Sequence, residues 1–292
     1  MAGGLERGPP LPPALIAAAA AGAWLILLVL EGRRPLRSTR EPKARRTARN
    51  LALAGLSAAS VQLTQAPALL WLARLMQGHR PGLMGRLDLP YAVEVAASVL
   101  LLDYTLWHWH WLTHRVPWMW RFHRVHHADR DMDASTALRF HFGEMVLSVP
   151  YRVLQVAAIG ADPLAVGLWQ GLLLVSILFH HSNVRLPIGL ERALVWLLVT
   201  PRMHGIHHSQ EKRETDSNWS SLLSAWDFLH GTARLDVPQR EIEIGVPAYR
   251  DPASVRLGKL LWLPFRRRSN DWTGPATPRP DGAAATRWRL VE

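Results

Sequence analysis

Residues 91–127 read YAVEVAASVLLLDYTLWHWHWLTHRVPWMWRFHRVHH, an apolar run that leads directly into a cluster of histidines and tryptophans. The apolar part is about twenty residues long, which suffices for a helix across the hydrocarbon core of a bilayer. Tryptophan favours the headgroup level, so Trp107, Trp109 and Trp111 predict that this end of the helix meets the membrane surface. The histidines that follow are therefore expected at, or just beyond, that surface.

Three further apolar runs cover residues 12–30, 51–76 and 145–179. The last is interrupted by Gly-Ala-Asp-Pro at 160–163, a turn-like sequence, and predicts a helical hairpin over 145–180 that enters and leaves the membrane on one side. The runs together predict an all-α integral membrane bundle with about four spanning helices, the hairpin included. Residues 190–200 are too short to span and predict a packed or interfacial helix.

The charge distribution predicts the orientation of this bundle. The formal net charge is +11, and residues 33–49 hold eight Lys or Arg side chains against one acid. Such a loop favours the cytoplasmic side, which would place a histidine-rich cap there in a multi-pass membrane protein. Because the basic residues lie between and after apolar runs, the charge does not indicate nucleic-acid binding. Cysteine is absent, which excludes disulfides, thiolate ligands and a cysteine nucleophile.

We expect three parts along the chain. Residues 1–100 would hold the N-terminal membrane helices and the basic cytoplasmic loop, with the first apolar run retained because no cleavage site follows it. Residues 101–235 would form a histidine-rich catalytic domain that contains the hairpin. Residues 236–292 would be a C-terminal cytoplasmic extension, flexible from about residue 266 because Pro, Arg, Gly and Ala dominate there.

The spacing of the histidines predicts a metal site. Thirteen of the fourteen follow residue 107, as His-x-x-x-His at 110–114 and as His-x-x-His-His at 123–127 and 204–208. Residues three or four apart are neighbours on a helix. Crowded imidazoles repel when protonated and lose solvation when neutral, unless a cation accepts their lone pairs. His79, His108 and His230 stand apart and are expected to be ordinary polar side chains, and the roles of His108, His180 and His230 stay open.

The number of histidines favours two ions. One structural zinc takes four ligands and a catalytic zinc usually three, and eight or more imidazoles exceed either need. Imidazole alone does not choose between zinc, copper, iron and nickel. The motif His-Glu-x-x-His is absent, which disfavours a metalloprotease.

The order of these boxes around a hairpin resembles the fatty acid hydroxylase and sterol desaturase superfamily, which are integral-membrane di-iron oxygenases. The resemblance covers about residues 103–232 and rests on DYTLWHWHWLTHRVP (103–117), WRFHRVHH (120–127), TALRFH (136–141), HHSN (180–183) and TPRMHGIHH (200–208). Two positions depart from the family pattern: His230 stands where the family often has Phe, and Trp219-Ser220 where it often has Tyr-Gly. Both lie outside the boxes and bear on substrate shape.

The resemblance implies a di-iron centre with two Fe ions, for which zinc could substitute in a purified sample. Carried over position by position, it implies ten ligands: His110, His114, His123, His126, His127, His141, His181, His204, His207 and His208. It also implies that O2 is used with electrons from outside. No haem, flavin or nicotinamide module is apparent, so a separate electron-donor protein is expected.

Carboxylates near the boxes are candidates to orient the ligands, because a ligating imidazole usually donates its other N–H to a carboxylate or carbonyl. The candidates are Asp103, Asp129, Asp133, Glu144, Asp216 and Asp227. Asn218 is a further candidate, to hold a metal-bound water.

The expected function is hydroxylation, or desaturation, of a lipid C–H bond by a membrane enzyme. A zinc-dependent membrane hydrolase or isomerase on the same histidine cage is an alternative, and a non-catalytic metal or lipid binder is another. Oxygen consumption under reducing conditions separates the oxygenase from the zinc enzyme. Neither the boxes nor the composition specifies the lipid.

Overall fold

The computed structural model describes residues 11–76, 79, 81–266, 270–273 and 288–291. Within them the chain is helical, and its only β structure is three isolated bridges. The helices are α1 (Pro13–Arg33), α2 (Lys43–Ser60), the π-helix η1 (Val61–Gln65), α3 (Ala66–Leu75), α4 (Tyr91–Arg115), α5 (Pro117–His127), α6 (Phe142–Ile159), α7 (Pro163–His181), α8 (Ile188–Leu194), α9 (Pro201–His207), α10 (Lys212–Thr215), α11 (Ala225–Leu229) and α12 (Leu257–Trp262). Short 3-10 turns are η2 (Met84–Arg86), η3 (Thr136–Leu138), η4 (Gln239–Glu241), η5 (Pro247–Tyr249), η6 (Pro252–Val255) and η7 (Leu263–Phe265).

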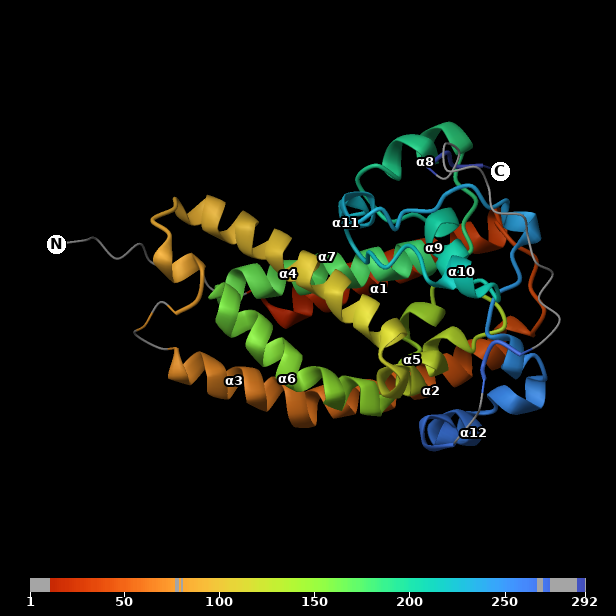
Figure 1. The fold of residues 1–292 in the computed structure, drawn as a ribbon, viewed down its shortest axis with the longest axis horizontal. Helices are drawn as coiled ribbons and strands as arrows, with labels where there is room; N and C mark the ends of the chain where they lie inside the picture. Colours follow the sequence, from red (N-terminus) through yellow and green to blue (C-terminus); the bar gives the residue numbers. More distant parts are fainter. Residues whose placement is uncertain (1–10, 77–78, 80, 267–269, 274–287, 292) are drawn as a thin grey trace.

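Long helices form one end of the molecule and short helices gather at the other (Figure 1). Helix α7 packs against α1 and α4, and α6 packs against α2, α3 and α4. The all-α prediction is confirmed. Among the described residues three helices are long and apolar enough to cross a membrane: α1, α6 and α7.

The expected second and third spans have a different composition from these three. Helix α2 begins with Lys43 and Arg45, η1 and α3 continue it, and none of the three is an apolar helix of 18 residues. Helix α4 has 25 residues, but it carries Glu94, Asp103 and its histidines, which lower its hydropathy. Residues 190–200 contain the end of the short α8, as a non-spanning segment should.

The hairpin over 145–180 is present as α6 and α7, joined by a tight turn at Gly160. Gly160 has φ 73°, and a Cβ there would lie 2.2 Å from the carbonyl oxygen of Pro81, so only glycine fits. Asp162 caps α7 by accepting the backbone N–H of Leu164 at 2.8 Å. Both helices run from this turn toward the end where α5 and α9 lie (Figure 1).

The C-terminal segment packs on α5. Val125 shares a buried cluster with Leu53 of α2 and with Tyr249, Val255 and Leu260. Buried Asp271 accepts hydrogen bonds from Trp120 Nε1 (2.9 Å), Arg124 Nη1 (3.1 Å) and Tyr249 Oη (2.8 Å). Most of the tail expected to be flexible, residues 267–269, 274–287 and 292, lies outside the described residues.

Candidate metal centre

Nine histidines converge in two buried groups. The first contains His110 and His114 of α4, His123 and His127 of α5, and His207 of α9; the second contains His126 of α5, His181 of α7, His204 of α9 and His208. Within each group one ring nitrogen per residue lies within 4.8 Å of the others. The rings of His127 and His208 stack at 4.3 Å between centroids and bring the two groups together.

Helix geometry explains how each His-x-x-His-His box serves both groups. Positions i and i+4 project on nearly the same side of a helix, whereas i+3 is offset from i+4 by about 100°. In α5, His123 and His127 belong to the first group and His126 to the second. In the second box the assignment is exchanged, because His204 and His208 belong to the second group and His207 to the first.

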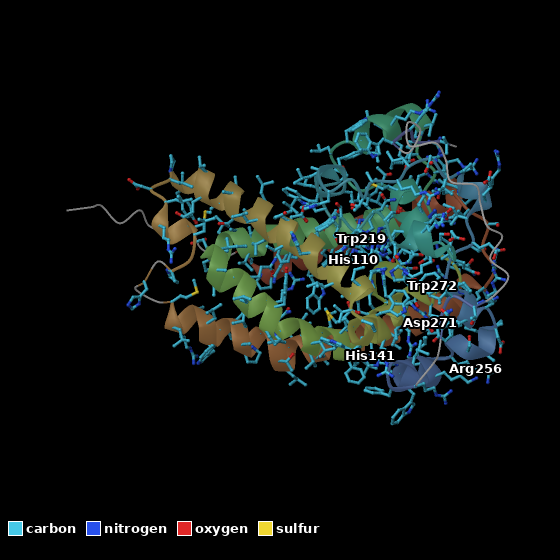
Figure 2. The ribbon with its side chains drawn as sticks, in the orientation of Figure 1. His110, His141, Trp219, Arg256, Asp271 and Trp272 are labelled. Carbon is cyan, nitrogen blue, oxygen red and sulfur yellow. The ribbon has the colours of Figure 1, made fainter. Side chains whose placement is uncertain are left out.

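Neighbouring acceptors hold four of the rings by Nδ1. His110 contacts the carbonyl oxygen of Trp219 at 2.7 Å, and Figure 2 labels these two residues next to each other; His207 contacts the carbonyl oxygen of Ser217 at 2.7 Å. His181 contacts the carbonyl oxygen of its own helix at Ile177 (2.8 Å). His123 contacts Glu144 Oε1 at 3.0 Å. If Nδ1 donates in each pair, the lone pair resides on Nε2, which faces the group.

The remaining ring nitrogens fit metal binding. The Nε2 atoms of His110, His114, His123 and His207 are buried without a hydrogen-bond partner among the described residues. In the second group His181 Nε2 lies 3.1 Å from His126 Nε2 and 3.0 Å from His204 Nε2. Buried nitrogens without partners are costly, and a divalent cation is the acceptor of lone pairs that would remove this cost.

Burial keeps these imidazoles neutral. It lowers the pKa of His207 to about 3, and the nearby His123 and His181 reinforce the effect. Burial and the neighbouring histidines also lower the pKa of His126, His127, His204 and His208. Neutral imidazole is the ligating form, so these rings are ready for metal at neutral pH.

The metal-free protein is therefore expected to lose stability as the pH falls. The pKa of His207 is near 3 when folded and about 6.5 when unfolded, so between these values only the unfolded chain takes up the proton. The free energy of unfolding should fall from about pH 6.5 downward, by up to roughly 1.4 kcal/mol per pH unit for each such histidine.

This expectation can be checked by urea unfolding of chelator-treated protein at pH 7.5, 6.5 and 5.5. The variant His207→Gln should show a shallower pH dependence. The variant His230→Gln, whose ring is exposed, should keep the wild-type dependence. A free energy of unfolding that stays constant over this range would contradict the burial argument.

Some expected site residues lie elsewhere. His141 belongs to neither group: its Nδ1 accepts the N–H of Gly143 (2.9 Å) and caps α6, and its Nε2 lies 3.1 Å from the Leu261 carbonyl oxygen. Figure 2 shows His141 well apart from His110. Both ring nitrogens of His141 thus contact backbone groups. The expectation that His141 lies with the other ligands is corrected here, since it belongs to neither group.

Of the carboxylates expected to orient ligands, Glu144 alone contacts a grouped histidine among the described residues. Asp103 accepts from Trp226 Nε1 at 2.6 Å, and Asp129 and Asp133 pair with Arg46. Asp216 pairs with Lys212. Asp227 contacts no grouped histidine directly but holds the backbone that does. It accepts the N–H of Trp219 at 3.0 Å, and the carbonyl of Trp219 contacts His110.

The hydrogen bonds that the side chain of Asn218 forms with described residues go to backbone groups and not to histidines. It adopts φ 55°, its Nδ2 donates to the carbonyls of Met203 (2.9 Å) and Arg234 (2.8 Å), and its Oδ1 accepts the N–H of Arg234 (2.8 Å). This left-handed position lies between the two residues whose carbonyls contact His207 and His110. Asn218 thus holds a turn rather than the water expected for it.

The backbone acceptors at Ile177, Ser217 and Trp219 could not be predicted from the sequence. Every residue carries a backbone carbonyl, so the residue types at these positions give no signal for this role. His180 is buried with its ring centroid 4.1 Å from that of His204, outside both groups. The sequence signal for a position of His180 near the histidine groups was that it directly precedes His181.

Comparison with known proteins agrees with this site. A model of the fatty acid hydroxylase family matches residues 95–232, which contain every grouped histidine. Residues 95–232 match this family, and the relatives described next support the same fatty acid hydroxylase and sterol desaturase superfamily for this part of the chain.

The relatives named by their activity are lipid hydroxylases and a monooxygenase. Over 182 residues the chain is 31% identical to an ornithine lipid hydroxylase of Rhizobium tropici, covering 61% of this chain and 52% of that protein. It is 29% identical to cholesterol 25-hydroxylase of Mus musculus, covering 48% and 47%. It is 30% identical to alkylglycerol monooxygenase of Xenopus tropicalis, covering 49% and 30%. The chain thus spans about half or less of these relatives, and no solved structure matches it.

Proposed function

We propose that this protein is a membrane-bound oxygenase that uses two iron ions and O2 to hydroxylate a lipid C–H bond. The observation that carries the proposal is the pair of neighbouring groups, one of five and one of four residues, in which every member is a histidine. The hydroxylase and monooxygenase names of its relatives support the oxygenase class. Desaturation of the same kind of bond is the neighbouring reaction.

The first group would hold one ion and the second group the other. When bound, the two irons would supply the redox chemistry that activates O2. The chain's own residues orient the ligands and exclude water. Glu144 holds His123 from behind, and the carbonyl of Trp219 holds His110, so that each Nε2 stays directed into the site.

We propose a multi-pass membrane location with the histidine groups at the cytoplasmic surface. The apolar helices α1, α6 and α7 support the membrane, and the basic residues 33–49 support the orientation. His181 ends α7, so one group begins where an apolar helix leaves the bilayer. A lipid could then reach the site from the hydrocarbon phase.

A direct test combines metal analysis with product analysis. Protein purified from iron-supplied cells should contain about two irons per chain, consume O2 under reducing conditions, and yield a lipid one oxygen heavier or two hydrogens lighter. Lipid extracts of cells with and without the intact gene would identify it. Zinc-loaded protein that converts a lipid without consuming O2 would instead support the hydrolase or isomerase alternative.

A separate electron donor is expected. Purified, iron-loaded protein should not turn over with NADPH and O2 alone, because the sequence has no apparent flavin or nicotinamide module to accept electrons from NADPH. Addition of a membrane extract that contains reductases should restore O2 consumption. Full activity with NADPH and O2 in the absence of the extract would contradict this expectation.

A further inference from the structure

A basic cavity of about 820 Å³ lies beside α9 and is lined in part by Arg202 of that helix. Eight arginines and four acidic residues line it, together with Ser209 and Gln210, which follow directly on His208. Its size is within the range of small-molecule sites. The proposed oxygenase chemistry gives these arginines no role.

The acids of the cavity are already engaged, whereas some arginines are not. Asp131 accepts the backbone N–H groups of Arg40 and Glu41, both at 2.8 Å, and Glu243 pairs with Arg40 and Arg250. Arg34 and Arg185 form no ion pair with any described residue and are exposed. Positive charge without a counterpart therefore remains at the rim of the cavity.

This rim lies where two apolar helices end. Arg34 follows α1, and Arg185 lies four residues beyond the end of α7. The N–H of Arg185 donates to the carbonyl of Arg34 at 2.7 Å, and the neighbours Pro35 and Val184 form a bridge. If α1 and α7 span the bilayer, both arginines lie at the level of the lipid headgroups.

Arg37 extends the positive charge into the interior. Its backbone is clamped by Asn183, which accepts its N–H at 2.9 Å and donates to its carbonyl at 2.8 Å. Its Nη1 donates to Gln239 Oε1 at 2.6 Å, while its Nε is buried without a partner. Burial lowers the pKa of Arg37 to about 10; Glu191 and Glu31 oppose this effect, and Arg202 adds to it.

We propose that this cavity binds a phosphate group through Arg34, Arg37 and Arg185. The planar guanidinium matches phosphate oxygens in paired hydrogen bonds, and several unpaired cations favour a group with more than one negative charge. Basic pockets at the cytoplasmic ends of spanning helices suit phospholipid headgroups. A free phosphate has the same chemistry. Arg37 is half-buried and its backbone is held by Asn183, so part of the positive charge lies inside the cavity, which favours a small anion over the surface of an acidic protein.

The test uses the full chain in detergent, with native mass spectrometry to count retained lipids. The probes are phosphatidic acid and diacylglycerol with the same acyl chains, which differ only by the phosphate. Wild-type protein should retain phosphatidic acid on the order of tenfold more than diacylglycerol. Inorganic phosphate, added as competitor, distinguishes the sources: full displacement at millimolar concentration supports a free-phosphate site, and resistance supports a lipid headgroup.

Two matched double variants distinguish lipid binding by the cavity arginines from binding by surface charge in general. Arg34→Gln with Arg185→Gln should abolish the preference for phosphatidic acid. Arg33→Gln with Arg45→Gln removes the same charge from exposed positions outside the cavity lining and should retain it. Metal content, which depends on neither pair, reports whether each variant is folded.

Thermal unfolding of the wild-type protein with each lipid gives a second measurement that needs no variant. A ligand that binds the folded state raises Tm. Phosphatidic acid should raise Tm and diacylglycerol should not. Equal retention of the two lipids, or equal losses in both double variants, would overturn the proposal. Capture of an acidic protein at this face without retention of phosphatidic acid would also overturn it. None of these outcomes depends on oxygenase activity.

Discussion

Replacing His126 or His207 by alanine is expected to lower bound metal and to abolish turnover while the protein still inserts into the membrane. The two residues belong to different groups, His126 to the second and His207 to the first. Each substitution removes one imidazole from one group and leaves the other histidines in place. The proposed chemistry needs both groups complete, because it uses two metal ions. Metal should fall from about two ions per chain to one or fewer, and lipid oxidation by at least about 100-fold.

Metal analysis, oxygen uptake and lipid product analysis on membranes with matched protein content would check this. His230→Ala is the control, because His230 lies outside both groups and stacks on Trp107 at 4.1 Å between ring centroids. It should keep its metal. If His126→Ala and His207→Ala both retained the wild-type metal content, the assignment of these nitrogens as ligands would be wrong.

Replacing Arg46 by methionine is expected to destabilise the protein by about 3–5 kcal/mol, because it removes the buried cation that pairs with both Asp129 and Asp133. Arg46 Nη1 donates to Asp129 Oδ2 at 2.8 Å, and Nη2 pairs with Asp133. Arg46 and Asp129 are 1% and 0% exposed, so solvent screens this pair little. Asn50 joins them by donating to Asp129 Oδ2 at 3.0 Å.

Unfolding of the purified variant in detergent would measure this loss. Arg45→Met is the matched control, since Arg45 is exposed on the same helix, and a change within about 0.5 kcal/mol is expected there. A loss below about 1 kcal/mol for Arg46→Met would show that the network contributes little.

The network also has a pH signature. Burial alone would raise the pKa of Asp129, but Arg46, Arg139 and Arg49 outweigh it and hold the pKa at about 2. A carboxyl group whose pKa is lower in the folded protein than in the unfolded chain stabilises the fold at pH values above its unfolded pKa, near 3.9. This contribution to the free energy of unfolding is lost as the pH falls toward 2. This loss should be smaller in Arg46→Met.

Periodicity predicted much of the fold. Apolar runs gave the all-α class, and the Gly-Ala-Asp-Pro interruption gave the α6–α7 hairpin with its bend at Gly160. The number of spans is harder to predict. Residues 51–76 contain few charges, yet the helix that contains their start begins with basic Lys43 and passes through a π-helix. Run length alone cannot show where a helix starts or how its turns are wound.

For the candidate site, nine of the ten expected ligands lie together, because spacings of three and four on short helices already place imidazoles on defined faces. His141 differs because a histidine at the start of a helix can also accept a backbone N–H, as it does from Gly143. Asp129 and Asp133 differ because their partner, Arg46, lies 83 residues from Asp129 in the chain. Local sequence does not reveal such distant pairing.

The packing of residues 246–265 and of Asp271 on α5 bears on how this protein can be shortened. The family match ends at residue 232, yet Tyr249, Leu260 and Asp271 cover the helix that supplies three of the grouped histidines. A chain cut at the end of the match would expose Val125 and leave the buried guanidinium of Arg124 without its carboxylate. The segment that packs around the histidine groups therefore extends beyond residue 232, where the family match ends.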